Sequence, residues 1–275
     1  GKEVLIDNLD VKVPFLYKLK NFFVKNPFPI YLTTMILFAL ISTVFLYLLF
    51  YFTTGITRLS YIGLVFGFII AFDGGVCFAN YLFSRMFKPR VIPRLDYMEG
   101  IPENSATMVI VPTLLSSKKR VSDMLSNLEK YFVAVSSENV FFTLVGDAKE
   151  SETEDIEEDE EIVKKGISTV NRLNEKYGAK KFFFVYRKRF FNASEEKWLG
   201  WERKRGAILK FNEFLIDGKK EDYRCVSDGF NTLPKIKYVL TVDADTIIPI
   251  NEARKLIGAI SHPVNKPVLN EEETA

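Results

Sequence analysis

The chain contains a long stretch without charge: no charged residue occurs from Pro27 to Thr57. Residues 28–54 of this stretch are long enough for a helix that crosses a bilayer, because about 20 apolar residues suffice. A second apolar run covers residues 59–87 and contains one acid, Asp73. We therefore predict a transmembrane hairpin at residues 28–88. Two buried helices of a soluble core are the alternative, but runs this long and this poor in charge disfavour it.

Positively charged residues flank the predicted hairpin at its two outer ends. They are Lys18, Lys20, Lys25, Arg85, Lys88, Arg90 and Arg94, whereas the connecting loop carries only Arg58. Because cytoplasmic flanks are enriched in Lys and Arg, we expect both ends of the chain in the cytoplasm. The pattern predicts a multi-pass membrane protein, with a cytoplasmic segment at 1–27, a membrane-proximal linker at 89–106 and a cytoplasmic domain at 107–275.

The net charge and the two cysteines argue against a nucleic-acid partner and against a disulfide bond. The net charge is +2 over 275 residues, so the composition does not call for a nucleic-acid partner. Cys77 falls in lipid and Cys225 in the cytoplasm, so no disulfide is expected between them.

Asp73 lies inside the second predicted span, where a carboxylate is costly and usually faces a polar cavity or partner. A position close enough to water for solvation is the alternative, and both interpretations stay open.

Beyond the linker, short apolar runs alternate with helical periodicity. Strands are expected at 107–112, at 140–145, at 182–186 and in a run that ends at Val242, and helices at 121–132, 163–177, 203–216 and 253–260. Strands that are separated by single helices favour a parallel sheet with right-handed crossovers. The sequence therefore predicts an α/β domain with a mostly parallel sheet and flanking helices.

Chemically notable residues follow three of these strands. They are Pro112 and Thr113 after the first strand, Asp147 after the second, and Asp243 and Asp245 after the last. Ligands of such sheets sit at the carboxyl ends of the strands, so these side chains should converge. Two carboxylates at i and i+2 point to one face and repel each other unless a cation or water separates them. Asp also ends strands at simple turns; a site for Mg²⁺ or Mn²⁺ is the sharper interpretation.

Phosphate binding would depend on side-chain cations, because the sequence has no glycine-rich phosphate loop. The segment Gly200–Gly206 supplies three basic residues before a predicted helix, where an anion would offset their conflict with the helix dipole.

Trp198 and Trp201 in the same region could stack on a ligand or pack the loop. The acidic run Glu150–Glu161 is expected to be a solvated loop that enters a helix.

Several of these segments together resemble a known enzyme family. Lys204–Asn212 and Tyr238–Asp245 are similar to the Lys-x-Gly-x-x-x-x-x-Asn and Asp-x-Asp elements of processive membrane glycosyltransferases with the GT-A fold. Pro93–Pro102, Val109–Leu115, Trp198–Gly206 and the stretch from Asp243 to Pro267 resemble the glycosyltransferase region of cyclic β-1,2-glucan synthases. The resemblance covers the chain from about residue 90 onward.

The resemblance implies an incomplete GT-A-like domain that uses UDP-glucose to extend a β-1,2-glucan. Asp243 and Asp245 would hold the metal and the donor diphosphate, Asp147 would contact the uridine, and Pro112 and Thr113 would line the nucleotide pocket. Lys204 and Arg205 would assist the diphosphate. The implied partners are UDP-glucose, a glucan acceptor, the lipid bilayer and the remainder of a long synthase polypeptide.

Formation of a β product from an α-linked donor is an inversion, which requires a general base for the acceptor hydroxyl. The family resemblance places this base beyond Ala275. We therefore expect the chain to hold the donor half of the active site and to be unable to transfer sugar by itself.

Two other functions fit parts of the pattern. Haloacid dehalogenase-type phosphatases also place Asp-x-Asp after an apolar strand, but they have a Thr two residues after the second Asp, where this chain has Ile247. Such an enzyme would hydrolyse p-nitrophenyl phosphate with Mg²⁺. A non-catalytic, membrane-anchored module that binds nucleotide sugars is the second alternative.

Overall fold

A computed structural model describes residues 14–267 apart from residues 56, 88, 90 and 136. The chain divides into two compact units, residues 1–91 and 92–275, which are described separately below. The predicted cytoplasmic segment lies outside the described residues as far as Val13, as do Lys88 and Arg90 of the predicted orientation signal.

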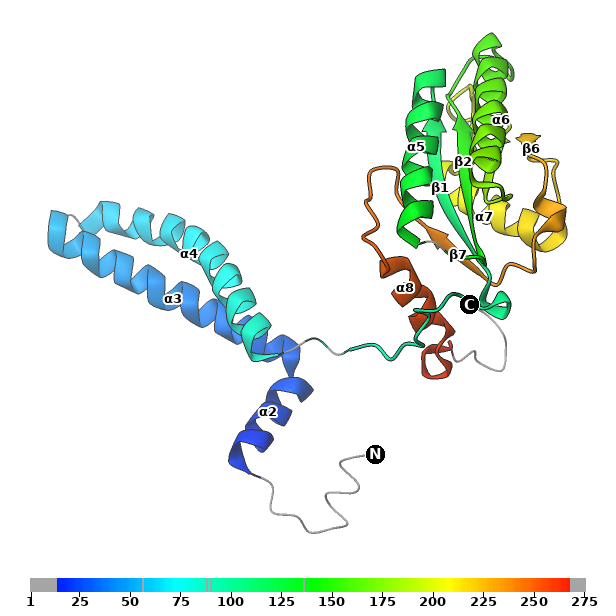
Figure 1. Cartoon of the computed structure of the whole chain (residues 1–275). Coiled ribbons are helices and arrows are strands. Elements are labelled where there is room, and N and C mark those ends of the chain that lie inside the picture. Colours follow the sequence, from blue (N-terminus) through cyan, green and yellow to red (C-terminus); the bar gives the residue numbers. More distant parts are fainter. Residues whose placement is uncertain (1–13, 56, 88, 90, 136, 268–275) are drawn as a thin grey trace. The chain divides into compact units, whose positions relative to one another are not determined.

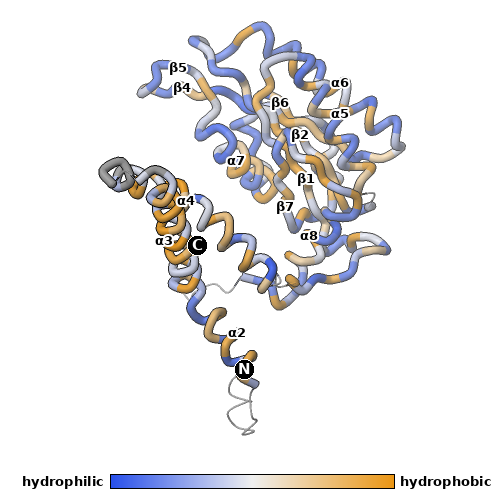
Figure 2. Tube along the Cα trace, turned by 90° about the vertical axis from the view of Figure 1, so that its left-hand side faces the viewer, coloured by the Kyte–Doolittle hydropathy of each residue, from blue (hydrophilic) through white to orange (hydrophobic). Residues whose placement is uncertain are grey.

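The first unit is helical. Helix α2 (Phe15–Lys25) precedes α3 (Pro27–Thr54) and α4 (Thr57–Met86), and α3 and α4 run side by side as an antiparallel pair (Figure 1). Two stretches are long and apolar enough to cross a membrane, Pro27–Thr53 and Gly63–Met86. Figure 2 shows hydrophobic residues along both helices. The predicted second span began two residues later than α4 does and ended one residue beyond it.

Small residues let α3 and α4 approach closely. Ala71, Gly75 and Ala79 recur at every fourth position of α4 and are buried. A Cβ atom at Gly75 would lie 2.6 Å from the Met35 carbonyl oxygen, so only glycine allows this approach. Near the other end of the contact, the Tyr31 hydroxyl donates a hydrogen bond to Asn80 Oδ1 at 3.0 Å. Asp73 is exposed on α4 and has no hydrogen bond or ion pair with any described residue.

The second unit contains a five-stranded sheet of order β6-β3-β2-β1-β7. Strands β1 (Thr107–Leu115), β2 (Val140–Ala148), β3 (Phe182–Arg187) and β7 (Tyr238–Thr241) are parallel, as the sequence predicted. Strand β6 (Tyr223–Val226) runs antiparallel at one edge and was not predicted. Its four residues include an arginine and a cysteine, so its pattern is too short and too polar to indicate a strand.

Helices cover both faces of this sheet. Helices α5 (Lys118–Val135), α6 (Glu157–Tyr177) and α8 (Glu252–Ser261) belong to one core cluster, and α7 (Arg203–Asp217) belongs to the other. Successive strand residues alternate between the clusters, as period-2 geometry requires. Val109, Phe142 and Phe184 face the first cluster, whereas Met108, Phe141 and Phe183 face the second. The alternation of buried residues therefore fixes which sheet face each helix covers.

A small hairpin precedes α7 and was also missed by the sequence analysis. It consists of β4 (Phe190–Asn192) and β5 (Lys197–Leu199). Trp198 and Ser151 exchange two backbone hydrogen bonds of 2.8 and 2.9 Å, so the hairpin is tied to the loop that follows β2. Strands of three residues are too short to show a periodic pattern.

The acidic run contains one residue that contradicts the expectation of a solvated segment. Asp159 is completely buried at the start of α6. It accepts hydrogen bonds from Arg189 Nη2 at 2.9 Å and from the Tyr186 hydroxyl at 2.8 Å, and it caps the helix by accepting from the Ile156 backbone N–H at 3.2 Å. A buried carboxylate is tolerated here because its lone pairs are satisfied and its charge is paired.

Candidate functional site

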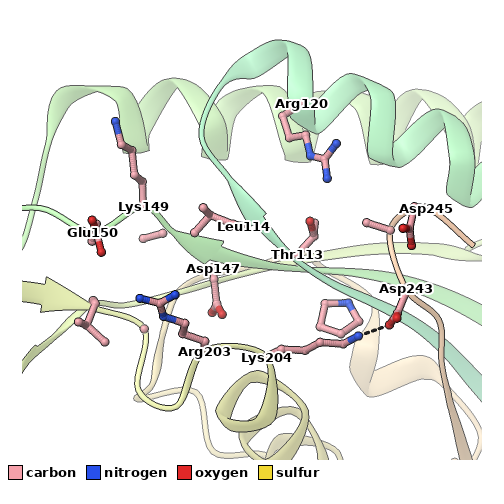
Figure 3. A pocket seen from close by; sticks show the side chains of 15 residues that line it. Thr113, Leu114, Arg120, Asp147, Lys149, Glu150, Arg203, Lys204, Asp243 and Asp245 are labelled. Carbon is pink, nitrogen blue, oxygen red and sulfur yellow. Dashed lines mark hydrogen bonds and ion pairs between the residues drawn. The ribbon is translucent and has the colours of Figure 1, made fainter. Parts of the chain in front are cut away.

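A cavity of about 780 Å³ opens at the carboxyl ends of β1, β2 and β7 (Figure 3). Its walls come from the end of β1, the end of β2, the turn after β7, the first turn of α5 and the segment that enters α7. The cations Arg120, Lys149, Arg203 and Lys204 and the acids Asp147, Glu150, Asp243 and Asp245 all line it. A cavity with both signs of charge suits a ligand that carries an anionic group and hydrogen-bonding groups.

The structure brings six of the seven predicted donor-site residues to this cavity. They are Pro112, Thr113, Asp147, Lys204, Asp243 and Asp245. Arg205 is not among the lining residues: its Nε lies 3.3 Å from Glu202 Oε2 and its side chain is 78% exposed. Arg203 lines the cavity in its place. The roles predicted for Lys204 and Arg205 at the donor diphosphate stay predictions.

Other lining residues were not predicted. Arg120 comes from the first turn of α5, and Lys149 and Glu150 follow β2. Only their position in the sequence could have indicated these three residues, because each follows a strand whose end carries a predicted donor-site residue. Figure 3 shows Arg120 on the opposite wall from Lys204.

The Asp-Ala-Asp turn begins where the sheet pairing of β7 ends. The Val242 N–H donates to the Ile110 carbonyl at 2.9 Å, and the Thr246 N–H donates to the Asp243 carbonyl at 3.0 Å. This tight turn leaves both carboxylates exposed beside the cavity. Lys204 Nζ forms an ion pair with Asp243 Oδ1. Because both side chains are about half exposed, this pair contributes little stability and can open for a ligand.

Asp147 is the buried acid of the cavity. Arg187 Nε lies 2.8 Å from Asp147 Oδ1, and the Arg187 side chain is only 1% exposed. The N–H is not directed at the oxygen, so the contact is an ion pair without a hydrogen bond. Burial raises the pKa of Asp147 to about 6, and the Arg187 charge opposes this rise.

Gly206 fixes the start of α7 and hence Lys204. A Cβ atom at Gly206 would lie 1.9 Å from the Trp201 carbonyl oxygen, which excludes every other residue without movement of the chain. Glu202, directly before α7, and Arg203, its first residue, adopt left-handed φ values of 47° and 46°. Arg187 Nη2 donates to the same Trp201 carbonyl at 3.0 Å. The segment is thus held in a strained conformation by contacts on two sides.

Buried Arg189 holds the cavity wall that carries Lys149 and Glu150. Its Nε donates to the Lys149 carbonyl at 2.6 Å and its Nη1 to the Glu154 carbonyl at 2.9 Å, while the guanidinium pairs with Asp159. These bonds hold the loop that carries Lys149 and Glu150. The position of this wall therefore depends on an ion pair that lies outside the cavity.

The two tryptophans have different surroundings. The Trp198 ring lies 5.7 Å from the Phe191 ring, centroid to centroid, within the hairpin, which favours the packing interpretation. Trp201 is 45% exposed and does not line the donor cavity. Both cysteines are free, Cys77 exposed and Cys225 partly buried.

The residues present fit a divalent cation only in combination with a phosphate ligand. No three His, Cys, Asp or Glu side chains gather in the part of the chain that the structure describes. Asp243 and Asp245 supply two carboxylates. Mg²⁺ is commonly bound by one or two carboxylates together with substrate phosphates, so this donor set suits it when a diphosphate completes the coordination.

Fold and cavity define an α/β domain with a ligand site at the carboxyl edge of a mostly parallel sheet, preceded by two candidate membrane helices. No family model matches the chain. The chain is similar to cyclic beta-(1,2)-glucan synthase NdvB of Rhizobium meliloti (strain 1021), with 31% identity over 204 residues, which is 73% of this chain and 7% of the synthase. This confirms the resemblance: the chain is homologous to one region of a cyclic glucan synthase, and its candidate membrane helices indicate membrane association.

Proposed function

We propose that this chain forms the donor-binding part of a membrane glycosyltransferase that transfers glucose from UDP-glucose to a growing β-1,2-glucan. Its main support is the convergence of Asp147, Lys204 and the Asp243–Asp245 pair on one cavity at the sheet edge. The homology to a glucan synthase region supports the choice of a glycosyltransferase. The acceptor is a glucan chain, and the lipid bilayer and the remainder of a synthase polypeptide are the other partners.

The charges of the cavity suggest how the donor binds. Asp147, at the buried end, would accept hydrogen bonds from the uracil, while Pro112 and Thr113 line the nucleotide. Lys204, released from Asp243, would pair with the diphosphate. Arg203 and Arg120 add charge from the two walls.

Asp243 and Asp245 would hold Mg²⁺ or Mn²⁺, which stabilises the negative charge of the departing diphosphate. The reaction inverts the anomeric carbon and requires a general base for the acceptor hydroxyl. We place the protein in the inner membrane with its catalytic region in the cytoplasm, where UDP-glucose is available.

Transfer of labelled glucose tests this function. Membranes that contain this chain together with the remainder of the synthase polypeptide should incorporate label from UDP-glucose into glucan. Asp245→Ala in that polypeptide should lower the rate by about 100-fold or more, because metal-bound charge stabilisation is worth several kcal/mol. Asp217→Asn is a matched control, since Asp217, the last residue of α7, has Lys219, which is exposed, as its one ion-pair partner among the described residues. Unchanged glucan production in Asp245→Ala would favour a non-catalytic binding module.

A further inference from the structure

A second cleft of about 710 Å³ lies beside the donor cavity. The hairpin β4–β5 and the segment that enters α7 form it, and it shares Leu199 and Arg203 with the donor cavity. Three aromatic side chains line it, Phe190, Phe191 and Trp201, and they are 39%, 56% and 45% exposed. We call these three residues with Asn192, Glu195 and Arg203 the aromatic cleft.

The composition of the aromatic cleft suits a sugar chain. The apolar C–H face of a glucose ring packs against the electron-rich face of an aromatic ring. The hydroxyl groups around the ring both donate and accept hydrogen bonds, and the cleft offers the Asn192 amide, the Glu195 carboxylate and the Arg203 guanidinium. Small-ligand sites combine apolar or aromatic walls with a few placed polar groups in this way.

Backbone contacts hold the aromatic cleft on several sides. The Trp201 backbone is held by buried Arg187 on one side and by close contact with Gly206 on the other. The hairpin is held by its paired hydrogen bonds to Ser151. Among the described residues, only four non-glycine residues have positive φ, and Glu196, Glu202 and Arg203 are three of them. Strain concentrated in this way marks functional segments, and a preformed site loses less entropy on binding.

The location of the cleft defines its role. Arg203, which the two cavities share, lies on the Glu150 side of Lys204, away from Asp243 and Asp245 (Figure 3). The cleft is therefore not where the acceptor hydroxyl meets the donor. We propose that the aromatic cleft binds glucose units of the glucan chain remote from its growing end, which keeps the chain attached between successive additions. This inference rests on the proposed function, because it assumes a glucan product.

Direct binding to the 275-residue chain in detergent tests the cleft. A linear β-1,2-linked gluco-oligosaccharide should bind in calorimetry, and Trp201→Ala should weaken it by about tenfold or more, as truncation of a central aromatic contact does. Phe191→Ala serves as a second variant on the hairpin. Ile216→Ala is the control, since Ile216 is 82% exposed on α7 and does not line the cleft. Circular dichroism checks that each variant is folded.

The chain has only two tryptophans, Trp198 and Trp201, so fluorescence reports on this region without a label. In Trp198→Phe, the emission of Trp201 should shift saturably as the oligosaccharide is added. The same sample is titrated with UDP and Mn²⁺, which separates the two proposals. Binding of UDP without binding of the oligosaccharide overturns the cleft and leaves the proposed donor site intact.

Binding of the oligosaccharide without UDP supports the cleft and contradicts the donor site, and loss of both contradicts both. Oligosaccharide affinity that is unchanged in Trp201→Ala and Phe191→Ala also overturns the cleft. A change in oligomeric state in these variants, without a change in sugar affinity, would identify the face as a protein interface instead.

Discussion

Asp147 combines burial, an arginine neighbour and a position in the donor cavity. Its pKa is raised from 3.8 to about 6, so between these values the folded state retains a proton that the unfolded state has lost. Stability contributed by this group is therefore present below about pH 4 and is lost as the pH rises through about 6. We predict that Asp147→Asn removes this part of the pH dependence.

Thermal unfolding of both proteins between pH 4 and pH 7 measures this difference in slope. UDP affinity should change in the opposite direction, because the ionised carboxylate is the better acceptor: it should rise as the pH passes about 6. Identical pH profiles for the protein and for Asp147→Asn would show that Asp147 does not titrate in this range.

The substitution Gly206→Ala tests whether the start of α7 positions Lys204. Gly206→Ala places a methyl group within 1.9 Å of the Trp201 carbonyl oxygen, so the segment must move. We expect a loss of about 1–3 kcal/mol in the free energy of unfolding, as in other overpacked sites, and weaker UDP binding. Gly178→Ala is a poor comparison because the φ of Gly178 is positive. Gly63→Ala meets open space on α4, so it should leave UDP binding unchanged and should not lower the free energy of unfolding. Unaltered UDP binding in Gly206→Ala would contradict this role.

At the scale of elements, α6 and the loop before it depend on the buried pair of Arg189 and Asp159. Arg189→Ala removes the nearer of the two arginines beside the buried Asp159 carboxylate and leaves Arg224 at 3.7 Å, and breaking a buried pair typically costs about 3–5 kcal/mol. Chemical denaturation measures the loss. Lys164→Ala breaks an exposed pair with Glu160 on the same helix and should have little effect. Equal effects of the two substitutions would show that the buried pair does not stabilise α6.

The long elements could be predicted from the sequence, and the short ones could not. Apolar runs such as Phe182–Phe184 indicate the parallel strands in the sequence, and the helical spacing of its apolar residues indicates α5. Strand β6 and the hairpin β4–β5 are stabilised by tertiary partners, the edge of β3 and Ser151, which no local pattern encodes. Asp159 was hidden inside an acidic run because its partner, Arg189, lies 30 residues away.

At the scale of the molecule, strand order explains why the site residues could be found. Parallel strands β1, β2 and β7 end at one edge, so residues that directly follow them must meet. Arg120 and Arg203 depend on where a helix begins, and helix boundaries are the least predictable feature of a sequence. Five of the predicted residues that line the cavity lie at or directly after strand ends, whereas Lys204 comes from a helix start. Of the lining residues that were not predicted, Arg120 and Arg203 lie at helix starts, and Lys149 and Glu150 follow β2.

We propose above all that this cavity binds a uridine diphosphate group together with a divalent cation. Two carboxylates, one of them paired with Lys204, should hold Mn²⁺ only weakly without a diphosphate. The most direct test is calorimetric titration of the 275-residue chain with UDP, with and without Mn²⁺, for the protein and for Asp245→Ala. We predict that Mn²⁺ strengthens UDP binding by about tenfold or more, within the usual range of coupling, and that Asp245→Ala abolishes this coupling. UDP binding that is absent, or equally strong without the cation and in Asp245→Ala, would contradict the claim.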